Sequence, residues 1–282
     1  MKTLLAVVGD GSAASVAETA LLAARPFGGY IVGLNALTTE YAVVFGGEMG
    51  FSVSSEVDRT LEREGRERRE QARAIFHAVM ARNGVPLDGT TGANGIAAEW
   101  REEAGRQNAV VGTLGRIFDL VVVERPAKLA SLAEATLEDA LFEGGRPVLM
   151  TPQTPPKSMG ENIVILWNNS TETARTVAFA MPYLERAKVV EVLSVEGSAV
   201  PGPSGDEMAA MLRRHGIPAT ARYIAQRGRM TPGEVFLAES RKAGADLLVK
   251  GAYTQSRLRQ MIFGGATRHI IMEADVPVIL AH

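Results

Sequence analysis

The chain repeats one order of apolar runs and turn signals, and this duplication constrains the fold more than any other feature of the sequence. The apolar runs match in chain order as follows: residues 3–8 with 162–167, 30–34 with 189–195, 118–122 with 245–249, and 147–150 with 277–280. The repeat length of about 130 to 160 residues is too long for a solenoid and fits two tandem domains.

A proline-rich segment separates the two copies. Residues 151–160 (TPQTPPKSMG) contain three prolines, which favours a stiff, extended spacer. In a chain of 282 residues, we expect domains at residues 1–152 and 160–282, each with its own core. We expect the two domains to pack as an internal pseudo-dimer across their short last strands, at Val148 and Val278.

Helical segments alternate with the apolar runs. The pattern predicts a helix over residues 13–24, which Ser12 or Asp10 can cap, and a long charged helix over residues 54–82. Residues 38–51 predict an irregular loop over the carboxyl edge of a sheet. Because strands that alternate with helices form parallel sheets covered on both faces, we predict an α/β fold. It consists of two tandem doubly wound, Rossmann-like domains, each with a five-stranded parallel sheet.

Composition excludes several classes of protein. The chain has no cysteine, which excludes disulfides and cysteine zinc sites. A net charge of -2 argues against a nucleic-acid binder. No apolar run approaches the ~20 residues of a membrane span, and Gly9-Asp10 ends the first run too early for a signal peptide. We therefore expect a cytoplasmic protein that binds neither nucleic acid nor membranes.

One stretch has the order of a strand, a glycine-bearing loop and the start of a helix. It runs from Gly251 to Thr267 (GAYTQSRLRQMIFGGAT), directly after the apolar run at 246–250. Glycines let the backbone approach a ligand, and free N–H groups at a helix start favour an anion such as phosphate. Glycine also serves loops for purely structural reasons, so a structural loop and a phosphate site both stay open.

The spacing of this stretch resembles the nucleotide loop of the universal stress protein family. That loop has Gly, two residues, Gly, nine residues, and then Gly followed by Ser or Thr; the positions map onto Gly251, Thr254, Gly264 and Gly265. Thr254 stands where the second Gly belongs, and Gly265 where the Ser or Thr belongs. The wider string, GAYTQSRLRQMIFGGATRHII and then PVILAH, is similar to the end of such a domain. The resemblance also favours a strand over a helical turn for residues 97–103.

The resemblance implies roles for residues of the second half. In members that bind ATP, an Asp in the first loop holds the ribose, the backbone at the end of the second strand meets the adenine, and the glycine loop takes the phosphates. A site for ATP or AMP would then use Asn168, Ser170, Val195, Gly251, Thr254, Gly264, Gly265 and Thr267. Asn168 can accept a hydrogen bond from a hydroxyl group, but it lacks the charge that makes such bonds about twice as strong.

The first half is a poor candidate for the same ligand. Residues 124–141, which correspond to the glycine loop, contain no glycine, and Glu124 would repel a phosphate. We therefore expect any nucleotide to occupy the second half only.

No residues form a catalytic or metal-binding constellation. The four histidines have no metal-ligand spacing: His77, His215, His269 and His282. We expect no enzyme, with weak ATPase activity left open. Two hypotheses remain: a tandem universal stress protein with a regulatory ATP or AMP site in its C-terminal domain, or a member without nucleotide that acts as a scaffold or binds another small molecule. Either could form a homodimer.

Overall fold

The structure is a computed structural model that describes residues 1–9, 11–37, 55–225, 228–252 and 265–282. Several predictions fall outside these residues. They concern Asp10, the loop at 38–51, and the motif positions Thr254 and Gly264.

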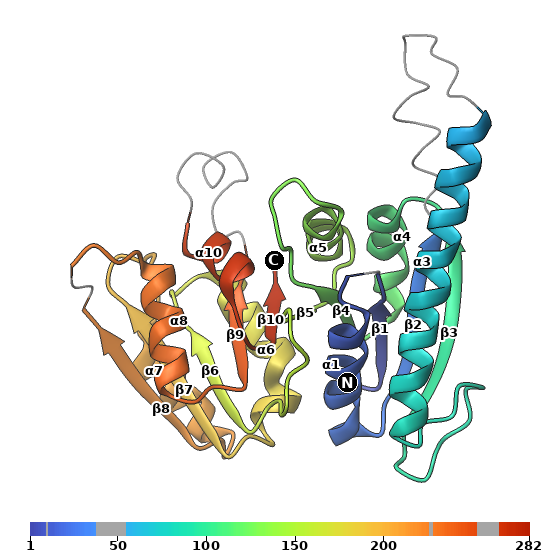
Figure 1. Cartoon of the computed structure of the whole chain (residues 1–282). Coiled ribbons are helices and arrows are strands. Elements are labelled where there is room, and N and C mark those ends of the chain that lie inside the picture. Colours follow the sequence, from blue (N-terminus) through green and yellow to red (C-terminus); the bar gives the residue numbers. More distant parts are fainter. Residues whose placement is uncertain (10, 38–54, 226–227, 253–264) are drawn as a thin grey trace.

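The first half alternates strands and helices from its first residues (Figure 1). Its elements are β1 (Thr3–Val7), α1 (Ala13–Ala24), β2 (Tyr30–Leu37), α3 (Ser55–Arg82), β3 (Ala97–Ala104), α4 (Gln107–Leu114), β4 (Leu120–Glu124), α5 (Leu132–Glu143) and β5 (Val148–Thr151). Short 3-10 turns follow α1 and α4, at Arg25–Phe27 and Gly115–Ile117. The strand expected at 97–103 is thus confirmed.

The second half repeats the alternation. Its elements are β6 (Asn162–Leu166), α6 (Thr171–Leu184), β7 (Val189–Val195), α7 (Gly205–Arg214), β8 (Ala219–Ile224), α8 (Pro232–Lys242), β9 (Leu247–Gly251), α10 (Ala266–Glu273) and β10 (Val278–Ala281). The spacer between β5 and β6 contains neither helix nor strand.

All ten strands join one sheet in the order β3-β2-β1-β4-β5-β10-β9-β6-β7-β8. The five strands within each half are parallel. The halves meet where β5 and β10 pair in antiparallel fashion, with Val148 opposite Leu280 and Met150 opposite Val278. The structure confirms two doubly wound halves and their joining through the last strands.

The apolar layers on the two faces of the sheet cross the join between the halves. One layer lies under α1, α3, α6 and α7, and the other lies under α4, α5, α8 and α10. The expectation of a separate core in each half is therefore wrong. Its physical reason is the continuous sheet, which brings helices of both halves side by side on each face.

Tyr183 of α6 fixes one of these cross-half contacts. Its hydroxyl donates a hydrogen bond to the backbone oxygen of Ala23 in α1, at 3.0 Å. Its ring meets that of Phe27 edge to face, with 5.0 Å between the centroids, and the guanidinium of Arg186 lies 4.7 Å from the centre of the Phe27 ring. Burial raises the pKa of the Tyr183 hydroxyl, which therefore stays protonated as a donor.

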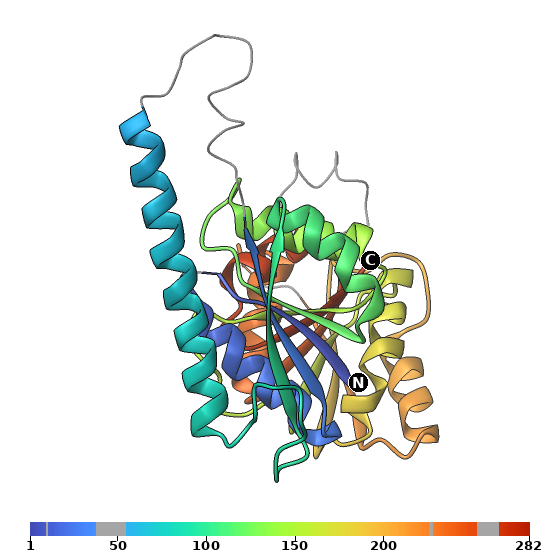
Figure 2. The ribbon, with the colours of Figure 1, turned by 90° about the vertical axis from the view of Figure 1, so that its right-hand side faces the viewer.

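Helix α3 packs on the sheet through its carboxyl-terminal half. Ala72, Phe76 and Val79 are buried, and Phe76 lies over Gly33, where a Cβ would meet its ring at 2.7 Å. Figure 2 shows that the amino-terminal turns of α3 reach beyond the strands. An ion pair between the exposed side chains of Arg63 and Glu67 lies between these two parts.

None of the described helices is long and apolar enough to span a membrane.

Candidate functional site

The predicted site lies at the carboxyl ends of two neighbouring strands. β6 and β9 pair side by side, with Ile165 opposite Val249. The chain continues from β6 to β7 on one side, whereas β10 follows β9 on the other side. Ligands of doubly wound folds bind at such a switch point. The loop that holds Asn168 and the strand end at Gly251 meet there.

The loop after β6 is closed by its own hydrogen bonds. The Oδ1 atom of Asn168 accepts hydrogen bonds from the hydroxyls of Ser170, at 2.9 Å, and Thr173. Ser170 in turn caps α6, because its hydroxyl accepts a bond from the Thr173 N–H at 3.2 Å. An amide oxygen has two lone pairs, so both are occupied in the structure. The side-chain oxygen of Asn168 therefore has no lone pair left for a hydrogen bond from a ligand, in contrast to the expectation from the sequence.

Gly251 packs directly against the start of α6. A Cβ at this position would lie 2.3 Å from the Thr173 backbone nitrogen and 2.6 Å from its hydroxyl oxygen. No side chain fits at such distances without moving the helix. Packing alone therefore requires glycine at position 251, whether or not a ligand binds.

Val195 lies at the end of β7, beside the first loop. Its side chain is buried in the apolar layer, and its backbone oxygen accepts bonds from the N–H of Ser198 at 3.2 Å and its hydroxyl at 2.7 Å. The following segment joins the loop of β6, because the Asn169 side chain donates to the Val200 oxygen at 3.0 Å. The structure thus brings Val195 close to Asn168 but uses its carbonyl in a turn.

Gly265 and Thr267 lie at the start of α10. Gly265 is the N-cap residue; it offers no side-chain cap, and none of the described residues lies within 4 Å of where its Cβ would be. Thr267 is buried in the first turn. The described residues therefore leave the helix start open at Gly265, as anion binding would require.

Lys250 and Glu172 are two charged residues at this site that sequence reasoning missed. Lys250 is 2% exposed, and its ammonium donates to the Gly251 backbone oxygen at 3.0 Å. Burial lowers the pKa of Lys250 to about 8, against the opposing effect of the Glu172 carboxylate. The signal in the sequence is the lysine itself, because it ends the otherwise apolar run at 246–250.

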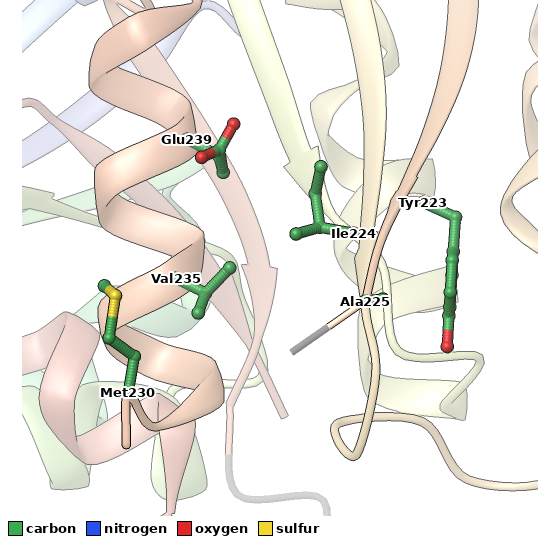
Figure 3. A pocket seen from close by; sticks show the side chains of 6 residues that line it. All are labelled: Tyr223, Ile224, Ala225, Met230, Val235 and Glu239. Atoms are coloured by element: carbon green, nitrogen blue, oxygen red, sulfur yellow. The ribbon is translucent and has the colours of Figure 1, made fainter. Parts of the chain in front are cut away.

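A cavity of about 480 Å³ lies beside the site, between β8 and α8. Figure 3 shows Val235 and Glu239 projecting from α8 toward the space that Ile224 borders. The cavity is lined by Tyr223, Ile224, Ala225, Met230, Val235 and Glu239. Ile224 pairs with Val195 across the strands. Glu239 forms ion pairs with Arg222 at 2.6 Å and with Lys242 at 2.6 Å, so the cavity suits an uncharged molecule better than an ion.

The corresponding position in the first half is built around a carboxylate. Glu124 ends β4 and accepts a hydrogen bond from the hydroxyl of Ser12. Ser12 occupies the N-cap position of α1, but its side chain makes no capping bond. The expected cap by Ser12 is wrong, because its backbone (φ -135°, ψ 16°) lies outside the extended region from which an N-cap side chain reaches the first turn, and its hydroxyl turns to the carboxylate instead. The N-cap of α5 is Ser131, which accepts from the Glu134 N–H at 3.2 Å.

Within the described ranges, no three His, Asp or Glu side chains gather in a way that could hold a metal ion. The ring of His282 lies against that of Phe142 in a tilted arrangement, with 4.5 Å between ring centroids, which gives His282 a packing role. The Cβ of His269 lies close to Gly233.

Comparison with protein families identifies the second half. Residues 159–282 match the model of the universal stress protein family. A comparison with curated proteins gives no match.

Solved structures match the fold across both halves. A universal stress protein from Archaeoglobus fulgidus DSM 4304 superposes with a TM-score of 0.65 at 14% identity, over 99% of this chain and 95% of that one. A functionally unknown protein from Pseudomonas aeruginosa PAO1 superposes with a TM-score of 0.55 at 14% identity, over 100% of this chain and 92% of that one. Residues 159–282 are therefore similar to the universal stress protein family, and the solved structures show that both halves of the chain share their fold.

Proposed function

We propose that this chain is a cytoplasmic stress-response protein whose second half binds an adenine nucleotide, ATP or AMP, as a regulatory ligand. The observation that supports the proposal is the contrast between the two switch points. The first half has the carboxylate of Glu124 at its strand end, whereas the second has Gly251 and an open helix start at Gly265. Phosphate is repelled by the first arrangement and accommodated by the second.

In this proposal the phosphates lie at the start of α10, near Gly265 and Thr267. The sugar and base extend over Asn168 and Ser170 toward Val195. In this proposal the nucleotide acts as a regulatory ligand and not as a substrate.

A second candidate is a protein that binds another small molecule or serves as a scaffold. Asn168 Oδ1 and the Val195 backbone oxygen are both occupied by internal hydrogen bonds, which favours this candidate. The cavity between β8 and α8 offers a separate place for a small ring compound.

Thermal-shift titration with ATP, AMP and cyclic nucleotides tests the proposal. A ligand that binds the folded state alone stabilises it by about 2.7 kcal/mol at a hundred times its Kd, so the unfolding midpoint should rise by a few degrees. Absence of any shift with all these nucleotides would favour the second candidate.

Matched variants locate the site. Gly265→Asp adds a negative charge where phosphate would bind, and Ser131→Asp does the same at the corresponding N-cap of the first half. Aspartate is a favourable N-cap, so both proteins should fold. The shift with ATP should disappear in Gly265→Asp and persist in Ser131→Asp. The opposite result would place the nucleotide in the first half.

A further inference from the structure

Lys250 is the one Asp, Glu, Lys or Arg among the described residues that is buried. It ends β9 one residue before Gly251, at the switch point of the second half. Lysine is almost never fully buried unless its ammonium is paired. The surroundings of this ammonium therefore bear on the function of the site.

The ammonium of Lys250 is bound by a backbone oxygen and not by a carboxylate of the described residues. In the part of the chain that the structure describes, it donates to the Gly251 backbone oxygen at 3.0 Å and forms no ion pair within 4.0 Å. Glu172 is the carboxylate that acts on it electrostatically. One oxygen of Glu172 accepts from Thr171 at 3.1 Å, and the other is buried without a hydrogen-bond partner. The two charges attract each other, but neither forms an ion pair with any of the described residues.

The fold does not need a cation at this position. In the first half Val123 occupies the corresponding place, because Val123 lies opposite Met150 of β5 as Lys250 lies opposite Leu280 of β10. Val123 is 1% exposed and simply packs in the apolar layer. A buried charge destabilises a fold that an apolar residue would suit, so Lys250 fits a functional role better than a structural one.

We propose that Lys250 is the interior cation of an anion site at the carboxyl end of β9, and that its ammonium compensates the phosphate charge of the bound nucleotide. This inference rests on the proposed nucleotide function and adds to it a preference for the more highly charged ligand. Lysine acts on phosphate as a point charge, and the low dielectric of the interior strengthens that attraction. In the free protein Glu172 acts on the ammonium only through its electrostatic attraction, and its negative charge opposes the incoming phosphate.

Calorimetric titrations of the full chain with ATP, adenosine and inorganic triphosphate test the inference. Lys250→Met keeps the length of the side chain and removes the charge. We expect Lys250→Met to lower the affinity for ATP about tenfold or more and the affinity for adenosine less than about twofold, since only the phosphates would feel the charge. The matched variant Glu172→Gln should raise the affinity for ATP, because it removes the opposing carboxylate.

The unfolding midpoint of each variant distinguishes binding from structure. If Lys250 serves the ligand, Lys250→Met should unfold at a higher temperature than the original chain while it binds ATP more weakly. Unchanged ATP affinity, or equal losses for ATP and adenosine, would overturn the role of Lys250.

The three ligands separate this inference from the proposed function. Binding of triphosphate that depends on Lys250, without binding of ATP or adenosine, would sink the nucleotide proposal and support the anion site. If ATP and adenosine bind with the same affinity to the original chain and to Lys250→Met, the nucleotide proposal is supported and the role of Lys250 is wrong. If the original chain binds none of the three ligands, both proposals are wrong.

Discussion

The fourth strands of the two halves end in the same geometry, but they differ in which of their last two residues is charged. β4 ends in Val123-Glu124 and β9 ends in Lys250-Gly251, in the same register against the last strand of each half. In the first half the charge comes last and ties the strand end to Ser12. In the second half the charge lies one residue earlier, inside the apolar layer, and the strand end contacts α6 without a side chain.

The difference shows that the scaffold tolerates either arrangement. Both strand ends contact the start of the helix that follows the first strand, one through a carboxylate and the other through direct backbone packing. The first arrangement places a carboxylate at the switch point, whereas the second places the Lys250 ammonium there together with the Glu172 carboxylate.

The largest expected effect is that of Gly251→Ala. Its Cβ would lie 2.3 Å from the Thr173 backbone nitrogen, and helix α6 must move to admit it. We expect a loss of about 3 kcal/mol in the free energy of unfolding, at the upper end of overpacking effects. Urea denaturation measures it.

Gly265→Ala is the matched control for this prediction, because no residue in the described part of the chain lies within 4 Å of its Cβ position and its φ of -69° suits alanine. It should lose at most about 1 kcal/mol, the usual cost of alanine at an N-cap. Equal losses in the two variants would refute the close packing at Gly251.

Replacing Lys250 by methionine should have the opposite sign. Because burial lowers the pKa of Lys250 to about 8, the charged form costs about 1 to 3 kcal/mol of stability. Lys250→Met should therefore stabilise the chain by about that amount at pH 7.

The pH dependence of this gain has a definite sign. Between pH 8 and the ordinary lysine pKa of about 10.4, the unfolded chain binds more protons than the folded one at this residue. The stability of the original chain relative to Lys250→Met therefore rises with pH in that window. The gain should be largest below pH 8 and shrink toward pH 10. Destabilisation by the variant at every pH would contradict the assigned cost of burial.

The bond between Ser12 and Glu124 should contribute a smaller amount. Ser12→Ala and Glu124→Gln should each lower the free energy of unfolding by about 1.5 kcal/mol, the lower end for hydrogen bonds to charged groups, since this bond is only partly buried. A double-mutant cycle measures the coupling between the two residues. Additive losses would show that the hydroxyl and the carboxylate act independently, and the contrast with Gly251 would then lose its energetic basis.

Most of the fold could be predicted from the sequence, because apolar runs that repeat in the same order leave few alternatives for the sheet. The single join through Val148 and Val278 follows from the position of those runs. The sharing of the apolar layers could not be predicted, because the contact between Tyr183 and Ala23 joins residues far apart in the chain.

The site was less predictable. The glycine at position 251 is visible in the sequence, but its cause, the approach of Thr173, is a tertiary contact. Lys250 was hidden within an apolar run, since a sequence pattern does not show whether a lysine at a strand end reaches solvent. Asn168 lies in the loop after β6, as expected, but its hydrogen bonds depend on hydroxyls at the start of the following helix.

The smallest expected effect concerns the start of the helix that follows each strand end. Ser131 caps α5 with its hydroxyl, whereas Gly265 begins α10 without a cap. Gly265→Ser should copy the first half, because its φ of -69° and ψ of 168° resemble those of Ser131, which are -101° and 162°. Serine differs from glycine at an N-cap by only a few tenths of a kcal/mol, so stability should rise by about that amount.

The ATP affinity of Gly265→Ser provides a second test of this substitution. A hydroxyl at the start of α10 can donate to a phosphate oxygen, and one such bond contributes about 0.5 to 1.5 kcal/mol. Calorimetric titration with ATP should then show a severalfold gain in affinity, and Ser131→Gly, its counterpart in the first half, should leave ATP affinity unchanged. Weaker ATP binding by Gly265→Ser, despite the added cap, would mean that the side chain obstructs the helix start, and the contrast between the halves would then depend on glycine at position 265 itself.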